Sequence, residues 1–303
     1  MKLDPRRLAT LLEVQRDGGI VSAAKTLNIS PSAVSQQINK LETEIGTILI
    51  NRTPTGATLT PAGKLLAESA ERVEAELAET YKNLLQLDGE ITGTVIIGAA
   101  PTPIQAILIP LVKDIELSLP GVEIVIQEVT EQQGRSLLRS GGIDLLIMER
   151  DITDGSVKSA PRGMRDIPFF DEPWLIVLPE HEPIPNSLAD MSSRTWLDIE
   201  PSTAASEAME RISATIEEIH KVNHRFLDFA VGIQMVASGL GCTVLPQLAL
   251  QGNIPENVNI VSLPGLGFRQ LVIRHRSNVD PTPAVQAIID EITFKAASIK
   301  NQL

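Results

Sequence analysis

Cysteine is almost absent from this sequence of 303 residues, in which Cys242 is the only one. A single thiol excludes a disulfide within the chain and any redox switch made of two cysteines, and it fits a reducing compartment. The first residues lack the apolar core and the cleavage site of a signal peptide. The most apolar stretch, residues 95–112, is interrupted by three prolines and a glycine before it could span a bilayer. We therefore expect a cytoplasmic protein with no membrane partner.

Signals of a cofactor, a metal site or a catalytic centre are also missing. Ser238–Gly241 reads Ser-Gly-Leu-Gly and does not complete the G-x-G-x-x-G pattern that binds nucleotide phosphates. His220 and His224 have a spacing that can bind a metal on a helix, but surface or structural histidines explain the pair more simply. Cys242 lies in an apolar segment, which predicts an inert core thiol. We expect no metal, no cofactor and no enzymatic activity.

Basic residues are scarce overall but not at the start of the chain. The formal net charge is −12, and the 43% hydrophobic and 21% charged residues are typical of a soluble globular protein with two or three domains. Residues 1–65 hold eight Lys and Arg against five Asp and Glu, so the rest of the chain carries −15. A protein that is acidic overall can still bind the phosphates of a nucleic acid through a locally basic head.

The first part of the chain predicts three helices. Asp4-Pro5 opens the first, because Asp caps free amides and Pro loses no hydrogen bond at that position, and Gly18-Gly19 ends it. A short second helix covers about residues 21–27 and buries small alanines. The third helix has Ser30 as its expected N-cap and Pro31 as its first helical residue.

This third helix has two faces of different chemistry. Its apolar row, at spacings of 4, 3 and 4, consists of Val34, Ile38, Leu41 and Ile45. Its opposite face consists of Ser32, Ser35, Gln36 and Asn39. Neutral donors and acceptors, with no acid before Glu42, fit the major groove of B-DNA, and the helix N-terminus favours a phosphate. An ordinary solvated helix in a three-helix domain is the alternative interpretation.

A hairpin and a long helix follow. Residues 48–60 predict two short strands around Pro54-Thr55-Gly56, with Arg52 beside the turn, which is the pattern of a wing. Thr60-Pro61 begins a helix that is expected to run to about Leu87. Its seam keeps 4,3 spacing and consists of Leu66, Ala70, Val73, Leu77, Thr80, Leu84 and Leu87. Such a seam is typical of a coiled-coil partner and predicts dimerisation, although packing on a second domain of the same chain is an alternative.

Strands and helices alternate in the rest of the chain. The expected strands and helices up to residue 148 form a βαβαβ pattern, which implies a parallel sheet. The group that follows contains strand-like segments at 165–170, 174–179, 195–199, 221–226 and 241–246, with helices at about 204–219 and 229–238. Further strand-like segments at 257–263 and 268–275 and a helix at about 283–299 complete the chain. Two similar α/β lobes with a cleft between them are the economical assembly.

The segment Leu8 to Gly63 contains GGIVSAAK, ISPSAVSQQI, LETEIG, NRT and LTPAG at fixed offsets. In these motifs it resembles the head of the LysR-type transcriptional regulators. RSGGIDLLI from Arg139, PFFDEPWLIVLPEHEPI from Pro168 and VASGLGCTVLP from Val236 look like the effector-binding region of the same family. The likeness extends over nearly the full length.

This resemblance implies an α/β protein made of three parts. We expect a winged helix-turn-helix DNA-binding domain at 1–60, a linker and dimerisation helix at 61–90, and an effector-binding domain at 91–303. The last resembles periplasmic binding proteins and has two lobes, 91–163 plus 265–303 and 164–264. The family further implies a regulator that binds double-stranded promoter DNA as a homodimer or homotetramer. Its DNA binding is expected to change when a small molecule enters the cleft.

By similarity, residues of the third helix and the wing contact the DNA. Ser32, Ser35 and Gln36 would reach bases and set specificity. The residues that would position the helix and wing on phosphates are Ser30, Asn39, Lys40 and Arg52.

In a two-lobed fold, ligands lie outside the carboxyl ends of the parallel strands, where loops lead into helix N-termini. The residues at four such places, which we expect to bind the effector, are Thr102, Thr130, Ser202, Thr203 and Phe229. Thr102 with Ser202 or Thr203 can bind a carboxylate, which is one candidate group of the effector, and Phe229 can cover an apolar portion. Glu131 and Asp228 suit an amine or a helix cap, and capping alone is an equal explanation for the hydroxyls.

A second hypothesis competes with a DNA-binding regulator. A two-lobed small-molecule binding protein or enzyme could use its first 90 residues only for assembly. That hypothesis predicts no sequence-specific DNA binding and tolerance of Gln36→Ala or Ser35→Ala. The operator, the effector's identity and the direction of regulation do not follow from the sequence.

Overall fold

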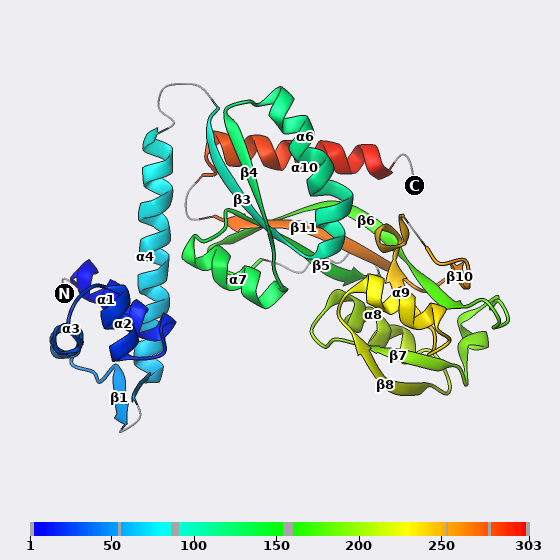
Figure 1. Cartoon of the computed structure of the whole chain (residues 1–303), viewed down its shortest axis with the longest axis horizontal. Helices are drawn as coiled ribbons and strands as arrows, with labels where there is room; N and C mark the ends of the chain where they lie inside the picture. Colours follow the sequence, from blue (N-terminus) through cyan, green and yellow to red (C-terminus); the bar gives the residue numbers. More distant parts are fainter. Residues whose placement is uncertain are drawn as a thin grey trace. The chain divides into compact units, whose positions relative to one another are not determined.

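The computed structural model describes residues 3–53, 56–85, 91–153, 160–252, 254–277 and 280–300. The chain divides into a first unit of Met1–Leu87 and Arg139–Gly142, which contains the head, and an α/β unit of Asp88–Leu138 and Ile143–Leu303. Figure 1 shows the elements of both units, and each unit is described by itself.

The head is a winged helix-turn-helix. Its elements are α1 (Pro5–Arg16), α2 (Ile20–Thr26), α3 (Pro31–Ile45), β1 (Ile50–Thr53), β2 (Gly56–Leu59) and α4 (Pro61–Leu85). The three predicted helices are confirmed, and so is the first cap, since the Asp4 carboxylate accepts a hydrogen bond from the Arg6 amide at 2.9 Å. β1 and β2 pair antiparallel from Ile50 opposite Leu59 to Thr53 opposite Gly56, as predicted for the wing.

The long helix α4 is fixed to the wing at its start. The Thr60 hydroxyl accepts a hydrogen bond from the Gly63 amide at 3.0 Å and donates to the Ile48 carbonyl at 2.8 Å. A Cβ atom at residue 63 would lie 2.1 Å from the Leu49 carbonyl oxygen, so only glycine allows this close approach. The Thr-Pro-Ala-Gly stretch therefore sets the angle between wing and helix.

The predicted seam of α4 divides between two environments. Ala70 is buried with the neighbouring Ala67 in the core of the head, where α4 packs against α1, and Leu66 is half-buried. Val73 and Leu77 are instead 42% and 63% exposed. The seam is therefore not one uniform surface, because its first turns are used inside the head. The predicted helix end at Leu87 and the side chain of Leu84 lie outside the described residues.

The α/β unit begins with a three-layered half. Its first elements are β3 (Gly93–Ala99), α5 (Pro101–Pro103), the π-helix η1 (Ile104–Leu108), α6 (Ile109–Ser118), β4 (Val122–Glu128), α7 (Glu131–Ser140) and β5 (Leu145–Ile152). β3 pairs parallel with both β4 and β5, which confirms the predicted βαβαβ arrangement. The π-helix was not predicted. It widens the helix just before Pro110, whose ring would otherwise clash with the carbonyl four residues earlier.

The second half of the unit contains the remaining elements. They are β6 (Met164–Pro179), the 3₁₀ helix η2 (Leu188–Met191), β7 (Thr195–Ile199), α8 (Ala204–Ser213), β8 (His220–Phe226), α9 (Phe229–Ala237), β9 (Thr243–Pro246), the 3₁₀ helix η3 (Gln247–Leu250), β10 (Val258–Val261), β11 (Phe268–Arg276) and α10 (Pro283–Lys300). α8 ends at Ser213, six residues before the predicted end at Ile219, since the chain turns after Ala214.

One strand joins the two lobes of this unit. The separate segments predicted at 165–170 and 174–179 are in fact the single strand β6. Its first part pairs with β11 and its last part with β9 and β10. A register shift between Leu271 and Val272 leaves Phe169 as the extra residue, so the bulge beside Pro168 bends β6 without ending it. The seven-stranded sheet has the order β10-β6-β11-β5-β3-β4, with β9 also paired to β6.

Each lobe has its own apolar core. In the first lobe, Leu145 and Ile147 of β5 join a core with residues of α6, η1 and α10, while Leu146 and Met148 join the smaller core beside α7. Figure 1 shows α6 and α10 on one side of the sheet and α7 on the other. The second lobe is built around Trp174, Trp196 and the buried faces of α8 and α9. The predicted two-lobed α/β architecture is thus confirmed.

Candidate functional site

The exposed side of α3 carries the polar residues that the sequence predicts to contact DNA. Ser32, Gln36, Asn39 and Lys40 are exposed, and Ser35 is half-buried. On the opposite side of the helix, the predicted apolar row is confirmed: Val34, Ile38 and Leu41 are fully buried and Ile45 is half-buried in the core of the head. The helix is therefore held by its apolar row and leaves a nearly uncharged face open to solvent.

Ser30 begins α3 and has a structural role. Its hydroxyl accepts a hydrogen bond from the Ala33 amide at 3.1 Å and lies 2.8 Å from the Ser32 hydroxyl. The turn before it contains Asn28 with a φ of 53°, a left-handed conformation that Asn tolerates better than most side chains. Sequence reasoning identified the cap but not this turn, although an Asn between two helices is a usable signal for it.

Acidic side chains of α3 are used inside the head. The Glu42 carboxylate accepts hydrogen bonds from the amides of Leu49 at 2.7 Å and Ile50 at 3.2 Å, which ties α3 to the start of the wing. Glu44 forms an ion pair with Arg7 of α1. Both acids therefore have partners within the head.

Arg52 belongs to β1 and lies opposite Ala57 in the hairpin. Its side chain and the turn residues Pro54 and Thr55 lie outside the described residues. The structure thus places the backbone of Arg52 in the wing, as predicted, and leaves its role as a phosphate contact a prediction.

The predicted effector residues of the first lobe differ in their surroundings. Thr102 follows β3 in the first helical turn and is 9% exposed. Thr130 is exposed and caps α7, because its hydroxyl is 3.0 Å from the Gln133 side-chain oxygen and 3.4 Å from the Gln133 amide. For Thr130 the capping interpretation therefore describes what its hydroxyl does in this structure.

The predicted residues of the second lobe are likewise a mixture. Thr203 caps α8: its hydroxyl accepts from the Ser206 amide at 3.1 Å and donates to the Glu200 carbonyl at 2.9 Å. Ser202 is exposed in the turn before it and has a φ of 65°. Asp228, which suited either an amine or a cap, accepts a hydrogen bond from the Ala230 amide at 2.7 Å and is the cap of α9.

Phe229 lies over a buried arginine. The guanidinium of Arg269 in β11 is 5.8 Å from the centre of the Phe229 ring and fully buried. The Glu172 carboxylate in β6 accepts from Arg269 at 2.8 and 2.5 Å, and Glu149 in β5 accepts from it at 2.9 Å. We call these three charged residues the Arg269 junction. Sequence reasoning missed it, because its members come from three segments that only the sheet brings together.

Burial and charge act differently on the arginine and on Glu172 of the junction. Burial lowers the pKa of Arg269, but the two carboxylates outweigh that effect and raise it above its ordinary value. The pKa of the Glu172 carboxyl is raised above its ordinary value, because burial outweighs the lowering by Arg269 and by the Leu248 amide, which donates to Glu172 at 2.5 Å. The hydrogen bond from Leu248 joins η3 to the junction, and η3 also contacts α5, which carries Thr102. Two of the predicted residues, Thr102 and Phe229, thus belong to elements that meet around Glu172.

A second charged cluster lies on the same strands. The Asp151 carboxylate at the end of β5 accepts hydrogen bonds from Trp174 of β6 at 2.8 Å and from Arg211 of α8 at 2.7 and 2.8 Å. Arg211 also donates to the carbonyls of Gly265 and Leu266. Charged groups of the central strands therefore hold α8, α9 and η3.

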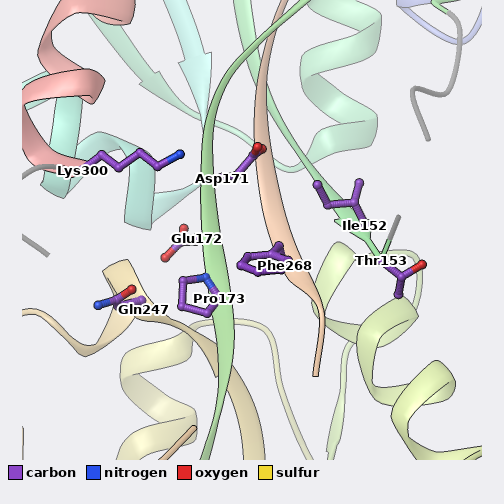
Figure 2. Close-up of a pocket in the computed structure, with 8 residues that line it drawn as sticks. All are labelled: Ile152, Thr153, Asp171, Glu172, Pro173, Gln247, Phe268 and Lys300. Carbon is purple, nitrogen blue, oxygen red and sulfur yellow. The ribbon is translucent and has the colours of Figure 1, made fainter. Parts of the chain in front are cut away.

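A cavity of about 500 Å³ lies beside the Arg269 junction. Figure 2 shows its lining residues, which are Ile152, Thr153, Asp171, Glu172, Pro173, Gln247, Phe268 and Lys300. None of the five predicted effector residues lines it. Glu172 and Gln247 connect it to the junction and to η3. Sequence reasoning missed this cavity, because its residues come from β5, β6, η3, β11 and the end of α10.

Other candidate chemistry is not supported in the described part of the chain. Cys242 is buried, and burial raises the pKa of its thiol to about 12. His220 and His224 are exposed on β8, a strand rather than a helix end. No group of three or more potential metal ligands occurs among the described residues. No described helix has both the length and the apolar character needed to cross a bilayer.

Comparison with known families gives two matches. The family described as bacterial regulatory helix-turn-helix protein, lysR family, matches residues 5–64. The family described as LysR substrate binding domain matches residues 88–296. Together the two matches cover well over half of the chain and both structural units.

Curated relatives share about a quarter of their residues with this chain. The DNA-binding transcriptional dual regulator OxyR of Escherichia coli is 28% identical over 233 residues, which cover 75% of this chain and 74% of OxyR. The nitrogen assimilation regulatory protein nac of Klebsiella aerogenes is 27% identical over 80% of this chain and 78% of its own length. The transcriptional regulator YfeR of Shigella flexneri is 27% identical over 96% of this chain and 94% of its own.

Solved structures share the fold. A full-length OxyR variant from Pseudomonas aeruginosa covers 97% of this chain and 98% of its own, with a TM-score of 0.68 and 21% identity. CbnR, a LysR family transcriptional regulator, covers 97% of this chain and 99% of its own, with a TM-score of 0.62 and 16% identity. CbnR in complex with its target DNA covers 97% of this chain and all of its own, with a TM-score of 0.56 and 19% identity.

Proposed function

Because the chain belongs to the LysR family of bacterial transcriptional regulators, we propose that it binds promoter DNA through α3 and the wing and that a small molecule in its α/β unit modulates this binding. The observation that carries the proposal is the division of α3 into a buried apolar row and an open face of hydroxyl and amide groups. Such a face hydrogen-bonds base edges and does not repel phosphates. CbnR, a protein of the same fold, is known in complex with its target DNA.

The proposed contacts divide by depth in the groove. Ser32, Ser35 and Gln36 read base edges from the first turns of α3. The cap Ser30 orients the free amides of the helix N-terminus toward a phosphate. The remaining proposed phosphate contacts are Asn39, Lys40 and Arg52. Because Glu42 and Glu44 are bonded within the head, they do not oppose this arrangement.

We further propose that the chain acts as a homodimer or homotetramer. The exposed Val73 and Leu77 on α4 support this, because two apolar side chains one turn apart on an exposed helix are suited to a second helix. Two copies of α3 would then meet two half-sites on one face of the duplex. We propose the boundaries 1–60, 61–90 and 91–303 for the domains, with lobes at 91–163 plus 265–303 and 164–264.

The effector response is proposed to reside where Thr102 and Phe229 meet the Arg269 junction, with Ser202, Thr203 and Thr130 at the neighbouring helix ends. A carboxylate is the proposed polar group of the effector. A ligand that alters the contacts of η3 or α9 changes the position of one lobe relative to the other. We propose that this change alters the DNA affinity of the head. We propose that this role involves no catalysis and takes place in the cytoplasm.

Several relatives are named hydrogen peroxide-inducible genes activators, and we propose that this chain does not respond to peroxide through a thiol. Peroxide reacts with thiolates, and Cys242 is the single cysteine of the chain. Its thiol is buried, and its pKa of about 12 keeps it protonated at neutral pH. The signal is therefore proposed to be a ligand that binds reversibly.

The proposal is tested by gel shift with DNA from upstream of the chain's own gene. We expect a shift at low salt that survives excess unrelated DNA and weakens steeply as salt rises. If no upstream fragment is shifted at low salt, the two-lobed binder with a head used only for assembly becomes the better description. Footprinting with and without candidate metabolites then finds the operator and the effector.

A further inference from the structure

The cavity beside β6 presents two charged groups of opposite sign that have no ion-pair partner among the described residues. Asp171 is an exposed residue of β6, and Lys300 is exposed in the last turn of α10. Figure 2 shows both side chains at the same cavity, together with the ring of Phe268. Two unlike charges at one cavity are complementary to a ligand that carries both charges itself.

Asp171 is held in place by a buried neighbour. The Gln270 side-chain amide donates to the Asp171 carboxylate at 3.0 Å, and Gln270 is 8% exposed. Only one carboxylate oxygen is used in this bond, so the other can accept a hydrogen bond from a ligand. The fixed position reduces the entropy that an exposed carboxylate loses when it binds a cation.

Lys300 differs from the lysine one and a half turns before it on the same helix. Lys295 is paired with Asp114 of α6 at 2.6 Å, away from the cavity. Lys300 lines the cavity and makes no ion pair within the described ranges. Its ammonium group is therefore available to an anion, whereas that of Lys295 is engaged.

Glu172 lines the cavity but is already occupied. One oxygen accepts from Arg269 and the other from the Leu248 amide. The charges offered to a ligand are thus one carboxylate, Asp171, and one ammonium, Lys300. Thr153 and Gln247 add neutral hydrogen-bonding groups.

The rest of the lining is apolar. Ile152, Pro173 and Phe268 contribute side chains, and Phe268 is 47% exposed, which is unusual for its size. A volume of about 500 Å³ is in the range of small-ligand sites. We propose that the cavity binds a small zwitterion of amino-acid size, with its ammonium group on Asp171, its carboxylate on Lys300 and its apolar body on Phe268.

The regulatory meaning of this site rests on the proposed function, but the binding itself does not. Glu172 and Gln247 line the same cavity, and Leu248 and Arg269 connect them to η3 and α9. Occupancy therefore reaches the second lobe through the Arg269 junction.

Calorimetry on the full chain tests the site with defined probes. The zwitterions are L-leucine, L-phenylalanine and 6-aminohexanoate, which differ in the separation of their charges. L-leucine methyl ester carries only the cation, and N-acetyl-L-leucine only the anion. We expect at least one zwitterion to bind, and each single-charge leucine derivative to bind about tenfold more weakly than L-leucine if leucine is that ligand, since one charge-assisted hydrogen bond is lost.

Two variants assign each charge. Asp171→Asn weakens the binding zwitterion about tenfold and leaves carboxylate-only binding unchanged, while Lys300→Gln has the converse effect on ammonium-only binding. The matched controls are Asp114→Asn and Lys295→Gln, which alter a charged pair outside the cavity. If all three zwitterions fail to bind, or if the controls weaken binding as much as the cavity variants, the proposal is wrong.

A gel shift with and without the bound probe separates this inference from the proposed function. A zwitterion that binds with the expected variant pattern but leaves the DNA affinity unchanged supports the site and contradicts its regulatory role. A protein that binds its promoter but none of the zwitterions keeps the proposed function and loses the site.

Discussion

The head and the α/β unit use charge in opposite ways. In the head, the acids of α3 are bonded internally, so that a neutral face with Lys40 remains outside. In the α/β unit, Arg269 and Glu172 are fully buried as an ion pair at the centre of the sheet. The first arrangement suits a partner that is itself a polyanion. The second suits a protein whose lobes switch between a few defined arrangements, because a buried charge needs a partner of opposite charge in each of them.

Removing the buried cation is expected to have the largest effect. Arg269→Met leaves Glu172 and Glu149 buried near each other without their partner, which is expected to cost about 3–5 kcal/mol of unfolding free energy. Urea unfolding followed by tryptophan fluorescence measures it, since both Trp174 and Trp196 lie in the α/β unit. The control is Arg225→Met, which breaks the more exposed pair with Asp198 and should cost less than about 1 kcal/mol. Equal losses of unfolding free energy in the two variants would show that the buried ion pairs of Arg269 stabilise the fold no more than the exposed pair of Arg225.

The anchor of the wing should have the next largest effect. Glu42→Gln keeps one acceptor but removes the charge from the carboxylate that binds the Leu49 and Ile50 amides, so we expect a loss of about 1–2 kcal/mol. Thermal unfolding of the head by circular dichroism measures it. Glu68→Gln, at an exposed position on α4, serves as the control. An unchanged transition would mean that the wing is held by its apolar contacts alone.

A charge on the exposed seam tests assembly. Leu77→Glu is expected to weaken the proposed dimer at least tenfold while leaving the head folded, because Leu77 is 63% exposed within one chain. Sedimentation velocity over a range of concentrations measures the change, and Glu76→Gln on the same turn is the control. A dimer that is unaffected by Leu77→Glu places the interface elsewhere.

The smallest expected effect concerns the buried thiol. Its pKa rises from 9.0 to about 12 on folding, so between these values the folded state keeps a proton that the unfolded state has lost. Stability from this group is complete below pH 9 and decreases as the pH rises toward 12. Cys242→Ala should therefore flatten the decline of Tm with pH in this window relative to the natural chain. An identical decline in both would contradict the buried, protonated state.

The sequence predicted what depends on local order. Ser30, Pro31 and the row from Val34 to Ile45 specify α3 within one segment, so its bounds and its buried side could be inferred directly. β6 could not be inferred in one piece, because Pro168 and Pro173 interrupt the pattern and only pairing with β11 and β9 shows that the strand continues. The role of a hydroxyl that precedes a helix could not be inferred either. Thr130 and Thr203 serve as caps whether or not a ligand lies nearby.

The cavity and the Arg269 junction could not be predicted. Arg269 meets Glu172 across 97 residues and Glu149 across 120 residues of sequence. Nothing in the surrounding sequence of any of the three indicates its partner, because ion pairs between strands depend on the register of the sheet. The surface of the head that we propose for DNA binding lies within one segment and follows from the sequence. The proposed ligand site of the α/β unit joins segments that are distant in the sequence, so it required the structure.

The most direct test of the central claim compares Gln36→Ala with Gln15→Ala. Both remove an exposed glutamine from a helix of the head, but only Gln36 lies on the polar face of α3. Fluorescence anisotropy with the footprinted operator and a scrambled duplex measures the ratio of the two affinities. We predict that Gln36→Ala lowers this ratio about tenfold, consistent with the loss of one base contact, with an unchanged melting curve. A ratio equal to that of Gln15→Ala would contradict the assignment of this face to DNA.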